Sequence, residues 1–130
     1  MKLKTQRNKE LVEFLVKLNK VFSGKYEYEI IVINDCSTDG TKQILEENSN
    51  LYSKLINNDR NLGKGGSIKK GLQLSNGTYI FFQDADNEYE PKDFENFFYV
   101  IENFKPDCII GSRFMFRNYI RSHYFFNKIG

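Results

Sequence analysis

The sequence predicts an α/β fold with a mostly parallel sheet and flanking helices. Apolar runs at residues 30–33 and 79–82 are typical of strands buried on both faces, as in a parallel sheet. Stretches with apolar residues at helical spacing separate such runs, and strands that alternate with helices form parallel sheets through right-handed crossovers. The 130 residues suffice for one domain with a single core.

The first half of the chain alternates helix, strand and helix. Apolar residues at helical spacing predict an amphipathic helix over residues 8–22, and Ser23 and Gly24 end it. The strand at 30–33 runs into polar residues that suit a helix N-cap, and a short helix follows at 42–48. The N-terminus of this helix therefore lies at the carboxyl end of the strand.

The second half of the chain continues the alternation. Its predicted elements are a short edge strand at 54–57, a helix at 67–75, a central strand at 79–82, a helix that starts at Pro91 and ends before Pro106, and a last strand at 108–110. Residues 114–130 mix aromatic and basic side chains, which predicts a helix whose partner lies elsewhere in the protein. The alternative for this tail is a helix in a membrane interface.

Composition narrows the classes of partner and compartment. A net charge of +2 is too small for a nucleic-acid-binding domain. There is neither an apolar stretch that could span a bilayer nor a signal peptide, so we expect a cytoplasmic protein, with the cytoplasmic face of a membrane as the alternative. Cys36 and Cys108 are predicted to lie at opposite edges of the sheet as reduced, unpaired thiols.

Two carboxylates follow the predicted central strand. Asp84 and Asp86 stand one residue apart at its carboxyl end, the edge at which open α/β sheets bind their ligands. Hard oxygen ligands in this arrangement suit Mg²⁺ or Mn²⁺, and the metal can then hold a diphosphate. The alternative is a solvated acidic loop, because loops favour Asp.

Three further loops are predicted to meet this edge. Gly63, Gly65 and Gly66 precede a helix and resemble a phosphate cradle without Walker spacing, the alternative being a flexible turn. Asp35 ends the first strand, where it would accept the N–H of a base or cap a helix. Arg113 offers a fork for phosphate, or else forms a surface ion pair.

Four segments together resemble family 2 glycosyltransferases. They are residues 29–41, the stretch from Arg60 to Gly65, Asp84-Ala85-Asp86, and Gly111-Ser112-Arg113, in the order that the family has them. Within the family the chain is most similar to polyprenyl-phosphate sugar transferases of the dolichyl-phosphate mannose or glucose synthase type. The resemblance implies a nucleotide-diphospho-sugar transferase (Rossmann-like) fold and inverting transfer of a hexose from a UDP- or GDP-sugar to a lipid-phosphate or glycan acceptor.

The resemblance also implies roles for individual residues. The nucleotide would be bound by Asp35, Asp39, Gly63, Lys64 and Asp84, the metal by Asp84 and Asp86, and the acceptor by Arg113 and Arg117; Asp86 and Arg113 would be the catalytic residues. The metal would neutralise the leaving diphosphate. An acceptor phosphate is already an anion, so a general base is less necessary.

The sequence departs from the family pattern in three places. Asn34 and Cys36 stand where the family usually has Asp and Gly, so Cys36 must adopt whatever backbone angle the glycine had. The family's first strand, which lies mid-sheet, has no counterpart before Asn8, and its distal acceptor segment is also missing. Residues 1–130 are therefore expected to form a partial domain, completed by a second chain or a longer gene product. The alternatives are a non-catalytic remnant and a sugar nucleotidyltransferase, whose glycine-rich, arginine-containing loop is absent.

Overall fold

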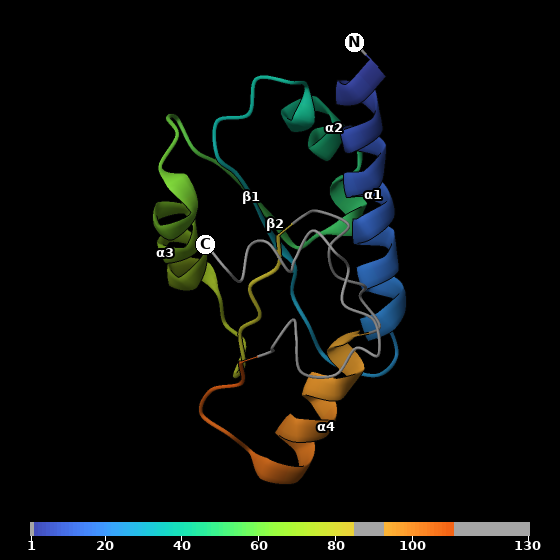
Figure 1. Cartoon of the computed structure of the whole chain (residues 1–130), viewed down its shortest axis with the longest axis vertical. Helices are drawn as coiled ribbons and strands as arrows, with labels where there is room; N and C mark the ends of the chain where they lie inside the picture. Colours follow the sequence, from blue (N-terminus) through green and yellow to red (C-terminus); the bar gives the residue numbers. More distant parts are fainter. Residues whose placement is uncertain (1, 85–92, 111–130) are drawn as a thin grey trace, which may run out of the picture. The chain divides into compact units, whose positions relative to one another are not determined.

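The computed structural model describes residues 2–84 and 93–110, with side chains from Asn8 onward. The chain divides into two compact units, Met1–Asp93 and Phe94–Gly130. The first unit contains α1 (Lys2–Phe22), β1 (Ile31–Asn34), α2 (Thr41–Glu47), the short 3-10 helix η1 (Ser49–Leu51), β2 (Lys54–Asn57) and α3 (Gly63–Leu74) (Figure 1). The second contains α4 (Phe94–Phe104).

The two strands form a parallel sheet, as the sequence predicts. Ile31 pairs with Lys54 and Asn34 with Asn57, with no slip between them. Backbone bonds continue the pairing beyond both ends, from Ser53 N–H to Ile30 and from Asn58 N–H to Asn34. Both strands therefore end at the same edge, and the loops that follow them start side by side.

The core of the first unit lies on one face of α1. Its buried side chains recur every three or four residues, the spacing of a single helical stripe: Leu11, Phe14, Leu15, Leu18 and Phe22. This helix contacts α2 and η1, and Leu45 of α2 is only 1% exposed. Asn19 closes the contact by donating from Nδ2 to the carbonyl of Leu51 at 2.8 Å.

The helix α3 packs against β1 on the other side of the strands from α1 (Figure 1). Gly71 permits this approach, because a Cβ at that position would lie 2.9 Å from Cδ1 of Ile33. The helix begins at Gly63, four residues before the predicted start. The sheet is thus covered by one helix on each side, which is the arrangement expected of a parallel α/β fold.

Two predicted strands are not strands in the structure. Residues 79–82 join no sheet, and Phe82 is 58% exposed rather than buried. Residues 108–110 are likewise outside any sheet, with Ile110 exposed. A strand forms only beside a hydrogen-bonded neighbour, and among the described residues β1 pairs with β2 alone.

The second unit keeps the predicted helix. Described residues are helical from Phe94 to Phe104, and the helix ends before Pro106 as expected; the predicted start at Pro91 lies outside the described residues. Neighbouring rings pack along the helix, with the centroids of Phe94 and Phe97 6.3 Å apart. The tail at 114–130 is also outside the described part of the chain.

Cys36 and Cys108 are both free, as predicted, and both are exposed. The prediction that they lie at opposite edges of one sheet is wrong for Cys108, because residues 108–110 join no sheet. No helix among the described residues combines the length and apolarity that crossing a membrane requires.

Candidate functional site

The carboxyl ends of β1 and β2 are joined by their last side chains. Asn34 donates from Nδ2 to Oδ1 of Asn57 at 2.9 Å, and its own Oδ1 accepts the backbone N–H of Ser37 at 3.1 Å. Asn34 is 6% exposed. A carboxylate could accept but not donate here, so an asparagine at this position serves as a structural link that also turns the following loop.

Asp35 joins the end of β1 to the start of α3. Its Oδ1 accepts the backbone N–H of Leu62 and Nδ2 of Asn58, each at 2.8 Å. The Leu62 N–H, followed by Asn58, lowers the pKa of this carboxyl below its ordinary value because both donors favour the charged form. Asp35 thus holds the backbone just before the first turn of α3, and its contact with a base stays a prediction.

The first turn of α3 carries the predicted glycine loop. Gly63 has φ +69°, a left-handed angle that favours glycine, and Gly65 and Gly66 already belong to the helix. Lys64 stands in this turn and its Nζ lies 2.7 Å from Oδ2 of Asp84, with both side chains exposed at 68% and 46%. The structure therefore brings together three predicted nucleotide-binding residues, Gly63, Lys64 and Asp84.

Asp39 is occupied at the start of α2. Its Oδ1 accepts the N–H of Thr41 at 3.3 Å and also contacts the Thr41 hydroxyl. The Asp39 carbonyl accepts Nδ2 of Asn8, a buried residue of α1, at 3.3 Å. The structure thus gives Asp39 a capping contact, while its predicted role toward a nucleotide stays a prediction.

The remaining predicted site residues, Asp86, Arg113 and Arg117, lie outside the described residues. Within residues 2–84 and 93–110, no three acidic, histidine or cysteine side chains gather into a metal site. Metal binding by Asp84 and Asp86 therefore stays a prediction. Of these two residues, the structure describes Asp84.

Sequence reasoning missed Asn58 and Lys70. Asn58 follows β2 directly, is 5% exposed, and bonds both Asp35 and Lys70. A signal for Asn58 was present, because it is a polar residue at the carboxyl end of a parallel strand, as Asp35 is. Lys70 lies in the middle of α3, and nothing in the sequence distinguishes it from Lys69.

Cys36 has the backbone angle that the comparison with a family glycine implies. Its φ is +60°, and a side chain with a Cβ in this region costs about 1–2 kcal/mol. We expect Cys36→Gly to raise the free energy of unfolding by up to about 1 kcal/mol, since the relief exceeds the added flexibility of the unfolded chain. Urea unfolding midpoints measure this change.

Cys108→Gly is the matched control for that substitution, because Cys108 is exposed and is not among the residues with positive φ. It is expected to give no gain. A loss of stability in Cys36→Gly as large as in Cys108→Gly would show that Cys36 is unstrained.

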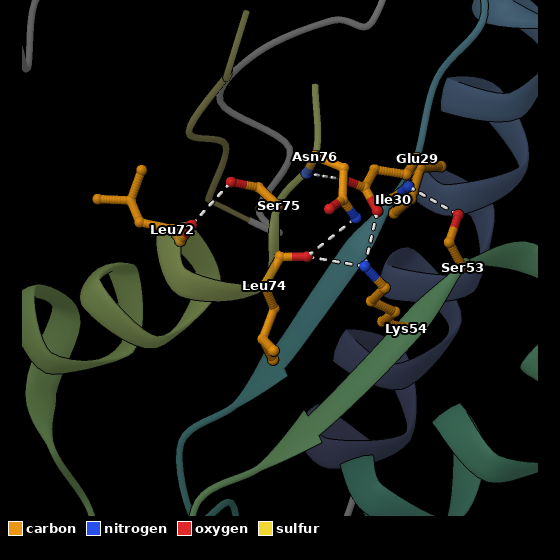
Figure 2. A network of polar contacts seen from close by, with 8 residues as sticks. All are labelled: Glu29, Ile30, Ser53, Lys54, Leu72, Leu74, Ser75 and Asn76. Atoms are coloured by element: carbon orange, nitrogen blue, oxygen red, sulfur yellow. Dashed lines mark hydrogen bonds and ion pairs between the residues drawn. The ribbon is translucent and has the colours of Figure 1, made fainter. Parts of the chain in front are cut away.

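A polar cluster at the opposite end of the sheet fixes the segment that leads to Asp84 (Figure 2). Lys54 donates from Nζ to Glu29 Oε2 at 3.0 Å and to the carbonyl of Leu74, the last residue of α3, at 2.7 Å. Glu29 Oε1 accepts the backbone N–H of Asn76 at 2.5 Å. The segment after α3 therefore starts beside the beginning of β1, where Asn76 bonds Glu29. At its other end Asp84 contacts Lys64 in the first turn of α3.

This cluster makes stability depend on pH. The Asn76 N–H, and then Lys54, lower the pKa of Glu29 below 4.5. A carboxyl whose folded pKa is lowered stabilises the fold above the unfolded pKa, and this contribution is lost as pH falls through the folded pKa. We expect Glu29→Gln to unfold at lower urea than the wild type at pH 7, with the difference vanishing towards pH 3.

Glu27→Gln controls for the change of net charge, since Glu27 is exposed and two residues away. If Glu29→Gln lowers the urea midpoint by the same amount at pH 7 and at pH 3, the stability of the cluster does not depend on the charge of Glu29.

Three curated proteins illustrate what the chain is similar to. It is 36% identical over 96 residues to a dolichyl-phosphate beta-glucosyltransferase of Dictyostelium discoideum, covering 68% of this chain and 29% of that protein. It is 32% identical over 110 residues to the dolichyl-phosphate beta-glucosyltransferase ALG5D of Trichomonas vaginalis, covering 80% and 33%. It is 35% identical over 97 residues to a poly-beta-1,6-N-acetyl-D-glucosamine synthase of Staphylococcus epidermidis, covering 73% and 23%.

These matches span no more than a third of each relative's length. No solved structure matches the chain. The model of the family described as glycosyl transferase family 2 matches residues 6–124, and the parallel sheet between helices fits the nucleotide-diphospho-sugar transferase fold in partial form. With nearly the whole sequence inside the family match, the chain belongs to glycosyl transferase family 2.

Proposed function

We propose that this chain is the donor-binding part of a glycosyltransferase that moves a hexose from a UDP- or GDP-sugar to an acceptor, which we take to be polyprenyl or dolichyl phosphate. One observation carries the proposal: Asp35, Lys64 and Asp84 converge on the first turn of α3, at the carboxyl edge of a parallel sheet. The similarity to two dolichyl-phosphate beta-glucosyltransferases supports the choice of acceptor.

The first turn of α3 suits a diphosphate. The N–H groups of Leu62 and Gly63 bond side-chain oxygens of Asp35 and Asn61, and the positive end of the helix dipole favours an anion beside the first turn. Lys64 adds an ammonium group that is exposed and stands in that turn. Asp35, in the adjoining loop, is the residue that we assign to the N–H of the base, and Asp39 and Gly63 border the same nucleotide.

Asp84 fits a divalent cation in position and in chemistry. Its carboxylate is an oxygen donor of the kind that Mg²⁺ and Mn²⁺ prefer, it is exposed, and it already carries a cationic partner in Lys64. We propose that Asp84 and Asp86 hold the metal. When bound, the metal would stabilise negative charge on the leaving diphosphate.

The protein's own residues bind and orient the two substrates. The bond from the anomeric carbon to the diphosphate oxygen breaks, and an acceptor oxygen bonds the same carbon from the opposite side. Lys64 neutralises part of the charge that the diphosphate gains. Arg113 and Arg117 are the residues that we propose to orient the acceptor phosphate, which needs no general base because it is already ionised.

A second candidate is a chain that binds the donor without transferring the sugar. The exposed Tyr79, Ile80 and Phe82 favour it, because the segment that carries Asp84 has no strand neighbour among the described residues. In that case the chain is a non-catalytic remnant that binds a nucleotide weakly or acts only with a partner chain. Both candidates require the same nucleotide site.

Amide chemical-shift mapping tests the nucleotide site. UDP and GDP with Mg²⁺ are expected to shift the amide signals of residues 35–39 and 61–66, while UMP and GMP shift them less because the second phosphate is missing. Signals of residues 15–22 of α1 serve as the internal control, since the contact of this helix with residues 35–39 is made by Asn8 near its other end. Shifts confined to α1, or none at all with either diphosphate, would contradict the proposed function.

A further inference from the structure

Asn58 is a buried polar residue whose backbone N–H and side-chain amide are both hydrogen-bonded. Its backbone N–H donates to the carbonyl of Asn34 at 2.9 Å, and its side-chain Nδ2 donates to Asp35 Oδ1 at 2.8 Å and to Ser67 Oγ at 3.1 Å. Its Oδ1 accepts Lys70 Nζ at 2.9 Å. Asn58 thus links the ends of both strands to α3.

Lys70 and Asp35 together determine which way the Asn58 amide faces. An ammonium group donates and never accepts, so the amide oxygen must point to Lys70 and the amide nitrogen to Asp35. The amide then lies between a cation and an anion with its dipole aligned to both, and a buried, fully bonded arrangement of this kind is rigid. Lys70 therefore acts on Asp35 through Asn58.

The effect of this chain of bonds reaches the first turn of α3. Asp35 Oδ1 accepts the N–H of Leu62 as well as the amide of Asn58. Leu62 lies two residues before Lys64, whose ammonium contacts Asp84. Any rotation of the Asp35 carboxylate would therefore release the start of the helix that presents Lys64.

We infer that Asn58, oriented by Lys70, is a positioning residue for nucleotide-diphosphate binding, which it supports by holding Asp35 and the first turn of α3 in place. The inference rests on the proposed function for the ligand. It adds that two residues hold the site in its binding geometry without contacting the ligand: Asn58, which follows β2, and Lys70 of α3.

Two substitutions separate orientation from folding. Asn58→Asp keeps the shape of the side chain and its attraction to Lys70, but it replaces the donor facing Asp35 by a second negative charge. Lys70→Met leaves Asn58 intact and removes only the cation that bonds its Oδ1, so it keeps the test valid if Asn58→Asp does not fold. Lys69→Met is the matched control, because Lys69 is the exposed neighbour on the same helix, and Lys70→Arg is the conservative rescue.

Two measurements are made on each variant. Carbon-13 NMR titration of the Asp35 carboxyl reports its orientation without any ligand, and calorimetry with UDP and with GDP in the presence of Mg²⁺ reports binding. In Asn58→Asp and Lys70→Met we expect the pKa of Asp35 to rise and nucleotide affinity to fall about ten- to hundredfold, the range of a lost hydrogen bond to a charged group. Lys69→Met and Lys70→Arg should match the wild type in both.

The outcomes distinguish the inference from the function on which it rests. Unchanged affinity in Asn58→Asp and Lys70→Met overturns the inference, whether or not the pKa of Asp35 moves. If the wild type binds neither nucleotide, the proposed function fails, and the inference as a statement about Asp35 then stands or falls on the titration. An equal loss of affinity in Lys69→Met would trace the effect to net charge and overturn the positioning role.

Discussion

The 130-residue chain alone is expected to show at most about one hundredth of the transferase activity of a chain extended by a family-type first strand and distal segment. The reason lies in the segment that carries Asp84. It is tied to Glu29 at its start and to Lys64 at its end, yet residues 79–82 form no strand between those points. Misplacing a reacting group by about 1 Å can cost a hundredfold in rate.

An inserted parallel strand would supply what β1 and residues 79–82 both lack. It would pair with the edge of β1 that no other described strand occupies and would bury Tyr79, Ile80 and Phe82. Full burial of one large apolar side chain contributes about 1.5–3 kcal/mol, a large share of the 5–15 kcal/mol that stabilises an ordinary domain. The extended chain is therefore expected to unfold at clearly higher urea as well.

The assay compares the two chains with UDP-glucose and GDP-mannose as donors and polyprenyl phosphate as acceptor. Flanking segments can be taken from the Dictyostelium relative, of which this chain matches only 29%. A control extension carries two prolines in the added strand, which then cannot donate to a ladder. Equal turnover by the isolated and the extended chain would mean that β1 needs no further neighbour.

Asp84→Asn is expected to weaken binding of UDP or GDP in the presence of Mn²⁺ by at least about tenfold, or about 1.4 kcal/mol. The substitution keeps the shape of the side chain and removes the charge that would hold the metal against the diphosphate. In EDTA the variant should bind as well as the wild type or better, because a diphosphate next to Asp84 is repelled when no cation lies between them.

Asp86→Ala should likewise abolish the dependence of nucleotide binding on metal.

Lys64→Met is expected to have the opposite effect, a greater loss of affinity without metal than with it. Removing the ammonium that contacts Asp84 should lower affinity in EDTA more than in Mn²⁺, since the metal can compensate for the lost positive charge. Glu47→Gln removes one negative charge, as Asp84→Asn does, from an exposed residue of α2. It should have no effect with Mn²⁺ or with EDTA. Equal losses for Asp84→Asn with Mn²⁺ and with EDTA would contradict a metal role for this carboxylate.

The sequence predicted the elements whose partners are close along the chain. The helix α1 and the pair β1 and β2 depend on local patterns and on a crossover of about twenty residues, so apolar spacing sufficed. The run at 79–82 has the same apolar character as β1 but differs in context, because a strand requires a neighbour that composition does not reveal. Its exposed side chains are the physical result.

The candidate site was predictable as a set of loops but not as a set of contacts. Asp35, Lys64 and Asp84 could be found because they follow strands or precede a helix. Two contacts depend on where α3 begins: the bond between Asp35 and Leu62, and the bond between Lys64 and Asp84. The sequence predicted that α3 begins after the glycines, four residues later than it does. The role of Lys70 depends on side-chain direction alone, for which a single sequence carries no signal.

Calorimetric titration of the wild-type chain with UDP and with GDP, in Mn²⁺ and in EDTA, tests the central claim most directly. If the carboxyl edge of the sheet binds a nucleotide diphosphate through a metal held at Asp84, one of the two nucleotides binds at least about tenfold more tightly with Mn²⁺ than with EDTA. Equal binding under both conditions would contradict the metal site. The absence of binding by either nucleotide would contradict the donor site itself.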